Sequence, residues 1–129
     1  MITDYAERRK DKRLYTRLSA QYTVLAPPSD SSLGGLTYDI SCGGLRMRCN
    51  EFMPLHTRLK VSLYLGSSLW MMTFASVKWI TKEPYNEQYQ VGLEAESADE
   101  EYSDNVKGYI DYTSKYHANP RAYSAYKVG

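Results

Sequence analysis

The sequence predicts a mostly β domain, a closed barrel or compact sandwich of six short strands, with one helix at its C-terminal end. In the middle of the chain, apolar residues recur at every second position, which is typical of strands that bury one face. Turn-forming residues interrupt these rows at short intervals, as they do in all-β domains. Near the end the apolar spacing changes to that of a helix. The length of 129 residues suits one domain with a core of its own.

Three strands are predicted between residues 18 and 49. Apolar and polar residues alternate from Leu18 to Val24, so this segment is expected to form a half-buried first strand. Two prolines and two glycines in residues 26–35 predict a loop, because these residue types do not sustain a ladder of hydrogen bonds. The next two strands are predicted at Leu36 to Asp39 and at Leu45 to Cys49.

Three further strands are predicted at residues 59–65, 69–80 and 91–95. Glycine and serine end the first of them, and a proline and an asparagine break the chain after the second. We expect Val77 and the two tryptophans, Trp70 and Trp79, to face the core, because large aromatic side chains dominate the energy of a core.

A helix of about five turns is predicted after the last strand. Ser97 and Glu100 have the spacing of a capping box, and the helix is expected to end near Asn119, which precedes a proline. The chain is therefore expected to comprise a flexible basic arm (1–12), a barrel domain with its closing helix (13–117) and a loosely ordered tail (118–129). One apolar stripe should pack against the barrel, formed by Tyr102, Val106, Tyr109, Ile110 and Thr113.

The net charge of +1 is unevenly distributed along the chain. Residues 1–17 carry six basic and three acidic side chains, which suggests an anionic partner at this end. No apolar stretch approaches the ~20 residues that span a bilayer, and the N-terminus lacks the apolar segment of a signal peptide. We therefore expect a cytoplasmic protein without membrane insertion. Cys42 and Cys49 lack zinc or redox spacing and are expected to be small hydrophobic core residues.

Two arginines, Arg13 and Arg17, stand four residues apart just before the first predicted strand. A guanidinium keeps its charge at any pH the protein will meet, so this pair is expected to face water or a ligand. Its fork of donors suits phosphate oxygens and also the acceptor edge of guanine. Taken alone, the pair is a weak signal, and it is more typical of a solvated basic arm.

A tight turn between the second and third predicted strands carries a second group of polar residues. Asp39 can accept hydrogen bonds from the N1–H and amino group of a guanine, and Ser41 can bond a phosphate or a base. Gly43 and Gly44 let backbone N–H groups approach a ligand closely. The same residue types also form ordinary turns, so the turn alone leaves both interpretations open.

Together, in this order and spacing, the two elements resemble the PilZ family of cyclic di-GMP receptors, whose motifs are Arg-x-x-x-Arg and Asp/Asn-x-Ser-x-x-Gly. The resemblance covers residues 8–112. It implies a six-stranded antiparallel β-barrel of the split-barrel type with a C-terminal helix. It also implies that Arg13 and Arg17 clamp phosphate and guanine, while Asp39, Ser41, Gly43 and Gly44 hold the other side of the ligand.

Four further basic residues could extend this site, namely Arg9, Lys12, Arg46 and Arg48. Lys12 directly precedes Arg13, the first motif arginine. In some relatives the residue at this position influences whether one ligand or an intercalated pair binds, so the stoichiometry stays open.

The function implied by the resemblance is a non-enzymatic receptor that changes the conformation of its arm on binding cyclic di-GMP and signals to a protein partner. Motility, exopolysaccharide and virulence control are the outputs the family suggests. No metal cluster, activated nucleophile or P-loop is visible, so no cofactor and no enzymatic activity are expected. The alternatives are a small barrel that binds single-stranded nucleic acid and a ligand-free protein-interaction module. Binding to DNA is not expected.

Overall fold

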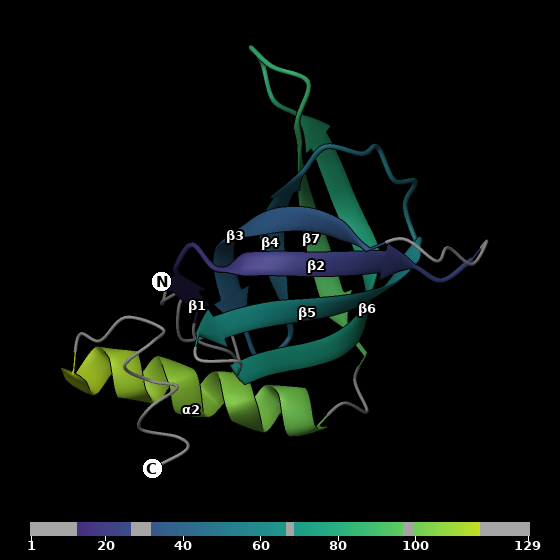
Figure 1. Ribbon diagram of the computed structural model, residues 1–129. Helices are drawn as coiled ribbons and strands as arrows, with labels where there is room; N and C mark the ends of the chain where they lie inside the picture. Colours follow the sequence, from purple (N-terminus) through teal and green to yellow (C-terminus); the bar gives the residue numbers. More distant parts are fainter. Residues whose placement is uncertain (1–12, 27–31, 67–68, 97–99, 117–129) are drawn as a thin grey trace, which may run out of the picture.

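The computed structural model describes residues 13–26, 32–66, 69–96 and 100–116. These residues form seven strands and one helix (Figure 1). In chain order they are β1 (Arg13–Tyr15), β2 (Ser19–Val24), β3 (Leu33–Ser41), β4 (Gly44–Cys49), β5 (Arg58–Gly66), β6 (Leu69–Lys82), β7 (Tyr89–Ala95) and α2 (Glu100–Tyr116).

The strands form one antiparallel sheet that closes on itself. Neighbouring strands follow the order β3-β2-β5-β6-β7-β4, and β4 pairs back onto β3. The predicted six-stranded antiparallel barrel is therefore confirmed. β1 is a seventh strand that the sequence pattern did not predict. It pairs with residues 39–41 of β3, whereas β2 pairs with residues 33–36 on the same edge, so β1 and β2 share one long partner strand.

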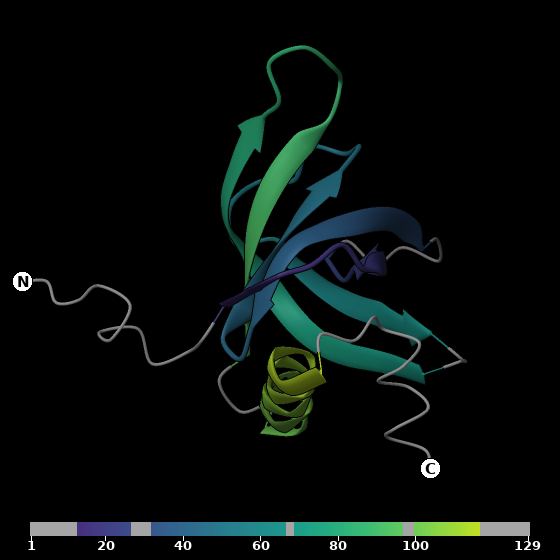
Figure 2. The ribbon, with the colours of Figure 1, turned by 90° about the vertical axis from the view of Figure 1, so that its left-hand side faces the viewer.

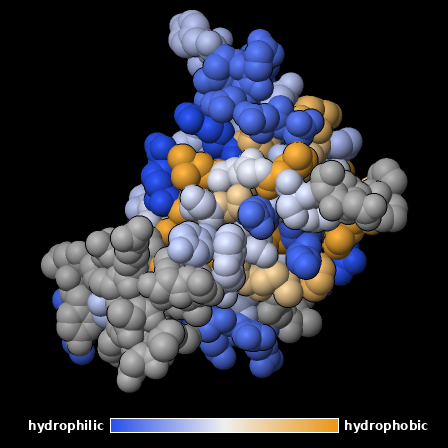
Figure 3. Space-filling model, viewed as in Figure 1, coloured by the Kyte–Doolittle hydropathy of each residue, from blue (hydrophilic) through white to orange (hydrophobic). Residues whose placement is uncertain are grey.

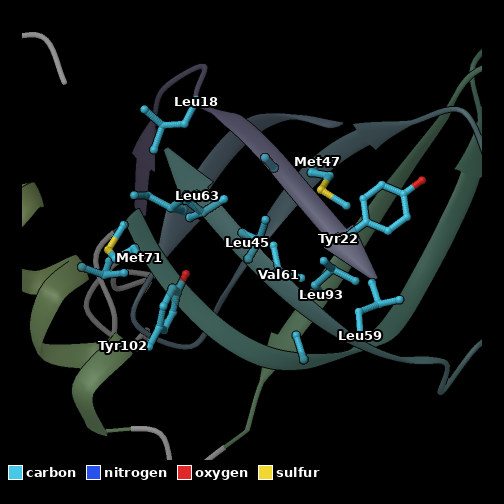
Figure 4. Close-up of a cluster of buried hydrophobic side chains, with 14 of the residues drawn as sticks. Leu18, Tyr22, Leu45, Met47, Leu59, Val61, Leu63, Met71, Leu93 and Tyr102 are labelled. Atoms are coloured by element: carbon cyan, nitrogen blue, oxygen red, sulfur yellow. The ribbon is translucent and has the colours of Figure 1, made fainter. Parts of the chain in front are cut away.

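The barrel interior is filled by the alternating apolar rows, as predicted. Side chains from six strands meet there, and α2 covers one end of the barrel with its apolar stripe (Figures 1 and 4). Viewed along its axis, the helix lies directly beneath the barrel (Figure 2). The stripe residues Tyr102, Val106, Tyr109 and Ile110 are all buried, and Thr113 is half-buried.

The helix begins at Glu100 with two acidic residues in its first turn, and Lys115 lies in its last turn. This arrangement of charges is favourable for the helix dipole. The predicted capping residue Ser97 and the predicted end at Asn119 lie outside the described residues. Within the ranges that the structure describes, no helix is both long and apolar enough to cross a bilayer.

Both cysteines are free thiols. Cys49 is buried as predicted, and burial raises the pKa of its thiol, which keeps it protonated and unreactive. Cys42 is only half-buried, and it packs against the edge of the core.

The loop predicted at residues 26–35 extends further toward the C-terminus than the loop in the structure. β3 begins at Leu33, so Gly34 and Gly35 belong to a strand. Strands tolerate glycine where two backbones approach closely. A Cβ at Gly35 would lie 2.9 Å from the backbone oxygen of Arg48, so the missing side chain allows this close approach.

The prediction that both tryptophans are core residues is wrong. Trp70 and Trp79 are 43% and 41% exposed, whereas Val77 is fully buried as predicted. Trp70 lies on the opposite face of β6 from the buried Met71, against the ring of Tyr64. Trp79 follows a β-bulge: Val77 pairs with Leu93 but Trp79 pairs with the adjacent Gly92, so one extra residue reverses the alternation.

The β6–β7 hairpin projects beyond the barrel at the end opposite α2 (Figure 1). Its end is hydrophilic in the space-filling view, in agreement with the polar residues of 82–88 (Figure 3). Tyr85 lies near the tip of this hairpin and is 96% exposed.

Replacing Gly44 by alanine should destabilise the fold. Gly44 starts β4 opposite Glu94, and a Cβ there would lie only 2.0 Å from the backbone oxygen of Leu93. We expect Gly44→Ala to lower the free energy of unfolding in urea by about 1–3 kcal/mol, as overpacking does. Gly34→Ala is the matched control, because nothing lies within 4 Å of a Cβ at that position. Equal midpoints for the two variants would contradict this account of Gly44.

Candidate functional site

A β-bulge in β3 places two consecutive side chains on the outer face of the barrel. Thr37 pairs with Met47 of β4, whereas Asp39 pairs with Arg46, so Tyr38 is the extra residue of β3. Thr37 and Ile40 are fully buried in the interior, and Tyr38 and Asp39 both contact arginines of β4. Bulges often redirect side chains next to functional sites. This bulge assembles the polar cluster described below.

The hydroxyl of Thr37 holds the segment that carries the second motif arginine. The Leu18 N–H donates to Thr37 Oγ1 at 2.7 Å, and Thr37 Oγ1 donates to the carbonyl oxygen of Thr16. The Thr16 N–H donates to the carbonyl oxygen of Tyr38 at 3.1 Å. Between these anchored residues, Arg17 is exposed and its Cζ lies 5.0 Å from the centroid of the Tyr38 ring.

Asp39 joins the two motifs. Its side chain is only 3% exposed, and Oδ2 accepts a hydrogen bond from Arg46 Nε at 2.9 Å. Arg13 Nη1 lies 3.5 Å from Oδ1. A buried carboxylate is tolerated when charge-assisted hydrogen bonds compensate its lost hydration. The first motif therefore contacts the second through an ion pair between Arg13 and Asp39.

The turn after Asp39 is tighter than predicted, because Ile40 and Ser41 still belong to β3. Ser41 Oγ donates to the carbonyl oxygen of Gly44 at 3.4 Å, and the Tyr102 hydroxyl of α2 donates to the same oxygen at 3.3 Å. The Ala95 N–H donates to the carbonyl oxygen of Gly43 at 2.8 Å. The glycine turn is thus held by β7 and by the closing helix.

These residues surround a hollow of about 250 Å³. Five of the six predicted ligand contacts line it, and Arg17 is the exception, since it lies over Tyr38 instead. Four residues were predicted to extend the site. Arg46 lines the hollow and Arg48 lies beside Tyr38, whereas Arg9 and Lys12 lie outside the described residues. The lining members of these predicted sets are Arg13, Asp39, Ser41, Gly43, Gly44 and Arg46.

Trp79 also lines the hollow, which the sequence analysis missed because it placed this residue in the core. Its indole lies over Gly92, where a Cβ would be only 2.1 Å from Nε1. The missing side chain of Gly92 therefore makes room for the indole. Only the bulge in β6 brings Trp79 to this face, and no pattern in the sequence marks that bulge.

A second polar group extends from Tyr38 to the base of the β6–β7 hairpin. The Tyr38 hydroxyl donates to Glu83 Oε2 and accepts from Arg48 Nε at 3.1 Å. Asn86 Nδ2 donates to the other oxygen of Glu83 at 3.0 Å. The hydrogen bonds from Tyr38 and Asn86 lower the pKa of the Glu83 carboxyl to about 2. Burial and the neighbouring carboxylate raise the pKa of Tyr38, so the phenol remains the donor.

The polar groups around Asp39 and around Tyr38 form one cluster, and this cluster is electropositive. Four guanidinium groups are balanced by the carboxylates of Asp39 and Glu83 alone, which leaves two positive charges among these six groups; the arginines are Arg13, Arg17, Arg46 and Arg48. Such a cluster attracts an anion. Across the described parts of the chain, no group of His, Cys, Asp and Glu side chains has the arrangement of a metal site.

Residues 7–112 match the family model for the PilZ domain. The chain belongs to the PilZ domain family. The match covers most of the chain and includes both motifs and the helix residues that bury against the barrel. None of the curated proteins matches the sequence.

Solved PilZ proteins share the fold at low sequence identity. The Escherichia coli protein YcgR, solved in complex with c-di-GMP, is 18% identical with a TM-score of 0.68, over 95% of this chain and 51% of that chain. The Bacillus subtilis inhibitor of motility, MotI/DgrA, is 20% identical with a TM-score of 0.66, over 84% of this chain and 52% of that one. The PilZ domain of YcgR with c-di-GMP is 19% identical with a TM-score of 0.57, over 78% and 86%. The chain thus spans about half the length of the first two proteins.

The Glu83 carboxylate should make stability depend on pH in the acid range. Its pKa is about 2 in the folded protein and about 4.3 in an unfolded chain. Its contribution is therefore fully present above the unfolded pKa and is lost as pH falls toward 2. Urea unfolding of the wild type and Glu83→Gln should give a stability difference that shrinks between pH 6 and pH 2.5. A difference that is independent of pH would contradict the role of the charge.

Proposed function

We propose that this PilZ protein is a non-enzymatic, cytoplasmic receptor for cyclic di-GMP. Arg13 of the first motif lines the same hollow as four residues of the second motif segment, and this observation carries the proposal; the four are Asp39, Ser41, Gly43 and Gly44. Residues from two motifs that are separate in the sequence would thus face one ligand. The positive charge of the cluster suits the two phosphates of a cyclic dinucleotide.

The hollow would hold one guanine end of the ligand. Its volume of about 250 Å³ is below the roughly 300–1,000 Å³ of pockets that enclose a drug-sized ligand, so the rest of the ligand would lie over the surface that carries Arg17. Asp39 would accept from the N1–H and amino group of the guanine, which is the base edge with two adjacent donors. Ser41 and the glycine turn would flank the phosphate.

Binding would exchange the partners of Asp39. In this structure Arg46 and Arg13 supply N–H donors to the carboxylate. A guanine offers a similar pair of donors, so its arrival would replace one of the arginines without leaving the buried carboxylate unpaired. The released guanidinium would then be available for a phosphate oxygen.

We infer that the output is a change in the N-terminal arm, residues 1–12, which alters a surface for a protein partner. The arm directly precedes Arg13, so a ligand that takes hold of this arginine would act on the arm. The structures of YcgR and of PlzA from Borreliella burgdorferi were solved with c-di-GMP, and MotI/DgrA is an inhibitor of motility. These relatives support a role in bacterial second-messenger signalling.

Isothermal titration with cyclic di-GMP tests the site. Removing a charge-assisted contact costs roughly 1.5–3 kcal/mol, so Arg13→Ala and Arg17→Ala should each weaken binding by about 10- to 100-fold. Arg58→Ala is the matched control, because Arg58 pairs with Glu96 and does not line the hollow. Its affinity should equal that of the wild type.

Unchanged affinity in both motif variants would reject this site. If cyclic di-GMP does not bind the wild type at all, the receptor function itself fails. A single-stranded oligonucleotide that binds with a steep salt dependence and no preference for guanine would instead support the nucleic-acid alternative. Cyclic di-AMP serves as the specificity control, because its base lacks the two adjacent donors that Asp39 would accept.

Tryptophan fluorescence should report ligand binding through one residue. Trp79 lines the hollow and is 41% exposed, whereas Trp70 does not line it and packs against the ring of Tyr64 in β5. Saturating cyclic di-GMP should therefore change the emission of the wild type and of Trp70→Phe, because the base alters the environment of the Trp79 indole. Trp79→Phe should show little change. The opposite pattern would place the ligand away from the hollow.

A further inference from the structure

Three arginines gather around one aromatic ring. The Cζ atoms of Arg17, Arg46 and Arg48 lie 5.0, 5.1 and 5.8 Å from the centroid of the Tyr38 ring. A guanidinium within about 6 Å of a ring face is attracted by its quadrupole. Tyr38 thus contacts an arginine from the first motif and two from β4, although neither motif includes this residue.

The ring is anchored at its hydroxyl. Glu83 accepts from this hydroxyl, and Arg48 donates to it at 3.1 Å. Glu83 is only 7% exposed and is itself held by Asn86. Tyr38 lies in the bulge of β3, and its hydroxyl is bonded to Glu83, directly after β6, and to Arg48 of β4, so the ring is fixed at both ends.

The guanidinium of Arg17 lies over this ring. Among the described residues, Arg17 makes no ion pair, and the Tyr38 ring is the contact that the structure gives to its guanidinium. A long exposed side chain samples many rotamers, and ordering it on binding costs affinity. A ring that already holds the guanidinium over the outer face of β3 reduces that cost.

We propose that Tyr38 is a positioning residue that presents Arg17 to the ligand. The inference rests on the proposed function, since it concerns the affinity of the same site for cyclic di-GMP. Tyr38 acts through Arg17 rather than through a ligand contact of its own. Its effect on binding must therefore depend on the presence of Arg17.

A double-mutant cycle tests this dependence. Loss of the cation–π contact in Tyr38→Leu should weaken cyclic di-GMP binding by roughly 3- to 30-fold in isothermal titration. Tyr38→Phe keeps the ring and should retain most of the affinity. In the Arg17→Ala background, Tyr38→Leu should change the affinity by less than about twofold, because the residue it positions is gone. Tyr64→Leu, on the outer face of β5, is the matched tyrosine control and should bind as the wild type does.

The outcomes separate the two proposals. If the wild type does not bind, the receptor function fails, whatever Tyr38 does. If the wild type binds and Tyr38→Leu causes the same loss with and without Arg17, or no loss, the positioning role is overturned. Should Tyr38→Leu not fold, Tyr38→Met replaces it, and the Arg17 Nε–H resonance adds a direct readout. Stacking over the ring should shift that resonance in the wild type and Tyr38→Phe but not in Tyr38→Met.

Discussion

The site depends on β3, which pairs with β1 on one edge and with β4 on the other. β1 brings Arg13, β4 brings Arg46, and both reach the carboxylate of Asp39 between them. Antiparallel pairing determines which residues stand opposite each other. Because β1 and β4 both pair with β3, the side chains of each have fixed positions relative to those of β3. The ion pairs at Asp39 are a consequence of this register.

The apolar pattern was enough to predict the strands and the helix, but it left both a closed barrel and a sandwich open, and the six-stranded barrel was implied by the resemblance to the PilZ family. In the segment from Leu59 to Leu65 every second residue is apolar, so these side chains share one face of the strand. That face is buried. The helix stripe from Tyr102 to Ile110 is buried for the same reason at helical spacing. The motif residues around the hollow could also be predicted, because Arg13 and Asp39 belong to two short motifs that together resemble those of the PilZ family.

The rest of the site could not be predicted, because it depends on insertions of one residue and on distant contacts. A β-bulge turns Trp79 outward, and another places Tyr38 and Asp39 on one face, yet neither interrupts the local composition. Glu83 meets Tyr38 across 45 positions of the chain, and no spacing rule connects them. β1 was missed because a strand of three residues is too short to show a periodicity.

The hydroxyl of Thr37 has a consequence that extends beyond this chain. It lies in the barrel interior, away from the hollow, and bonds the backbone on both sides of Arg17. Valine is nearly isosteric with threonine and would fill the same space, but it would leave the Leu18 N–H and the Thr16 carbonyl oxygen without this partner. Under the proposed function, a homologue with valine here would keep every motif residue and still present its second arginine poorly, so intact motifs would not by themselves make a PilZ domain competent to bind.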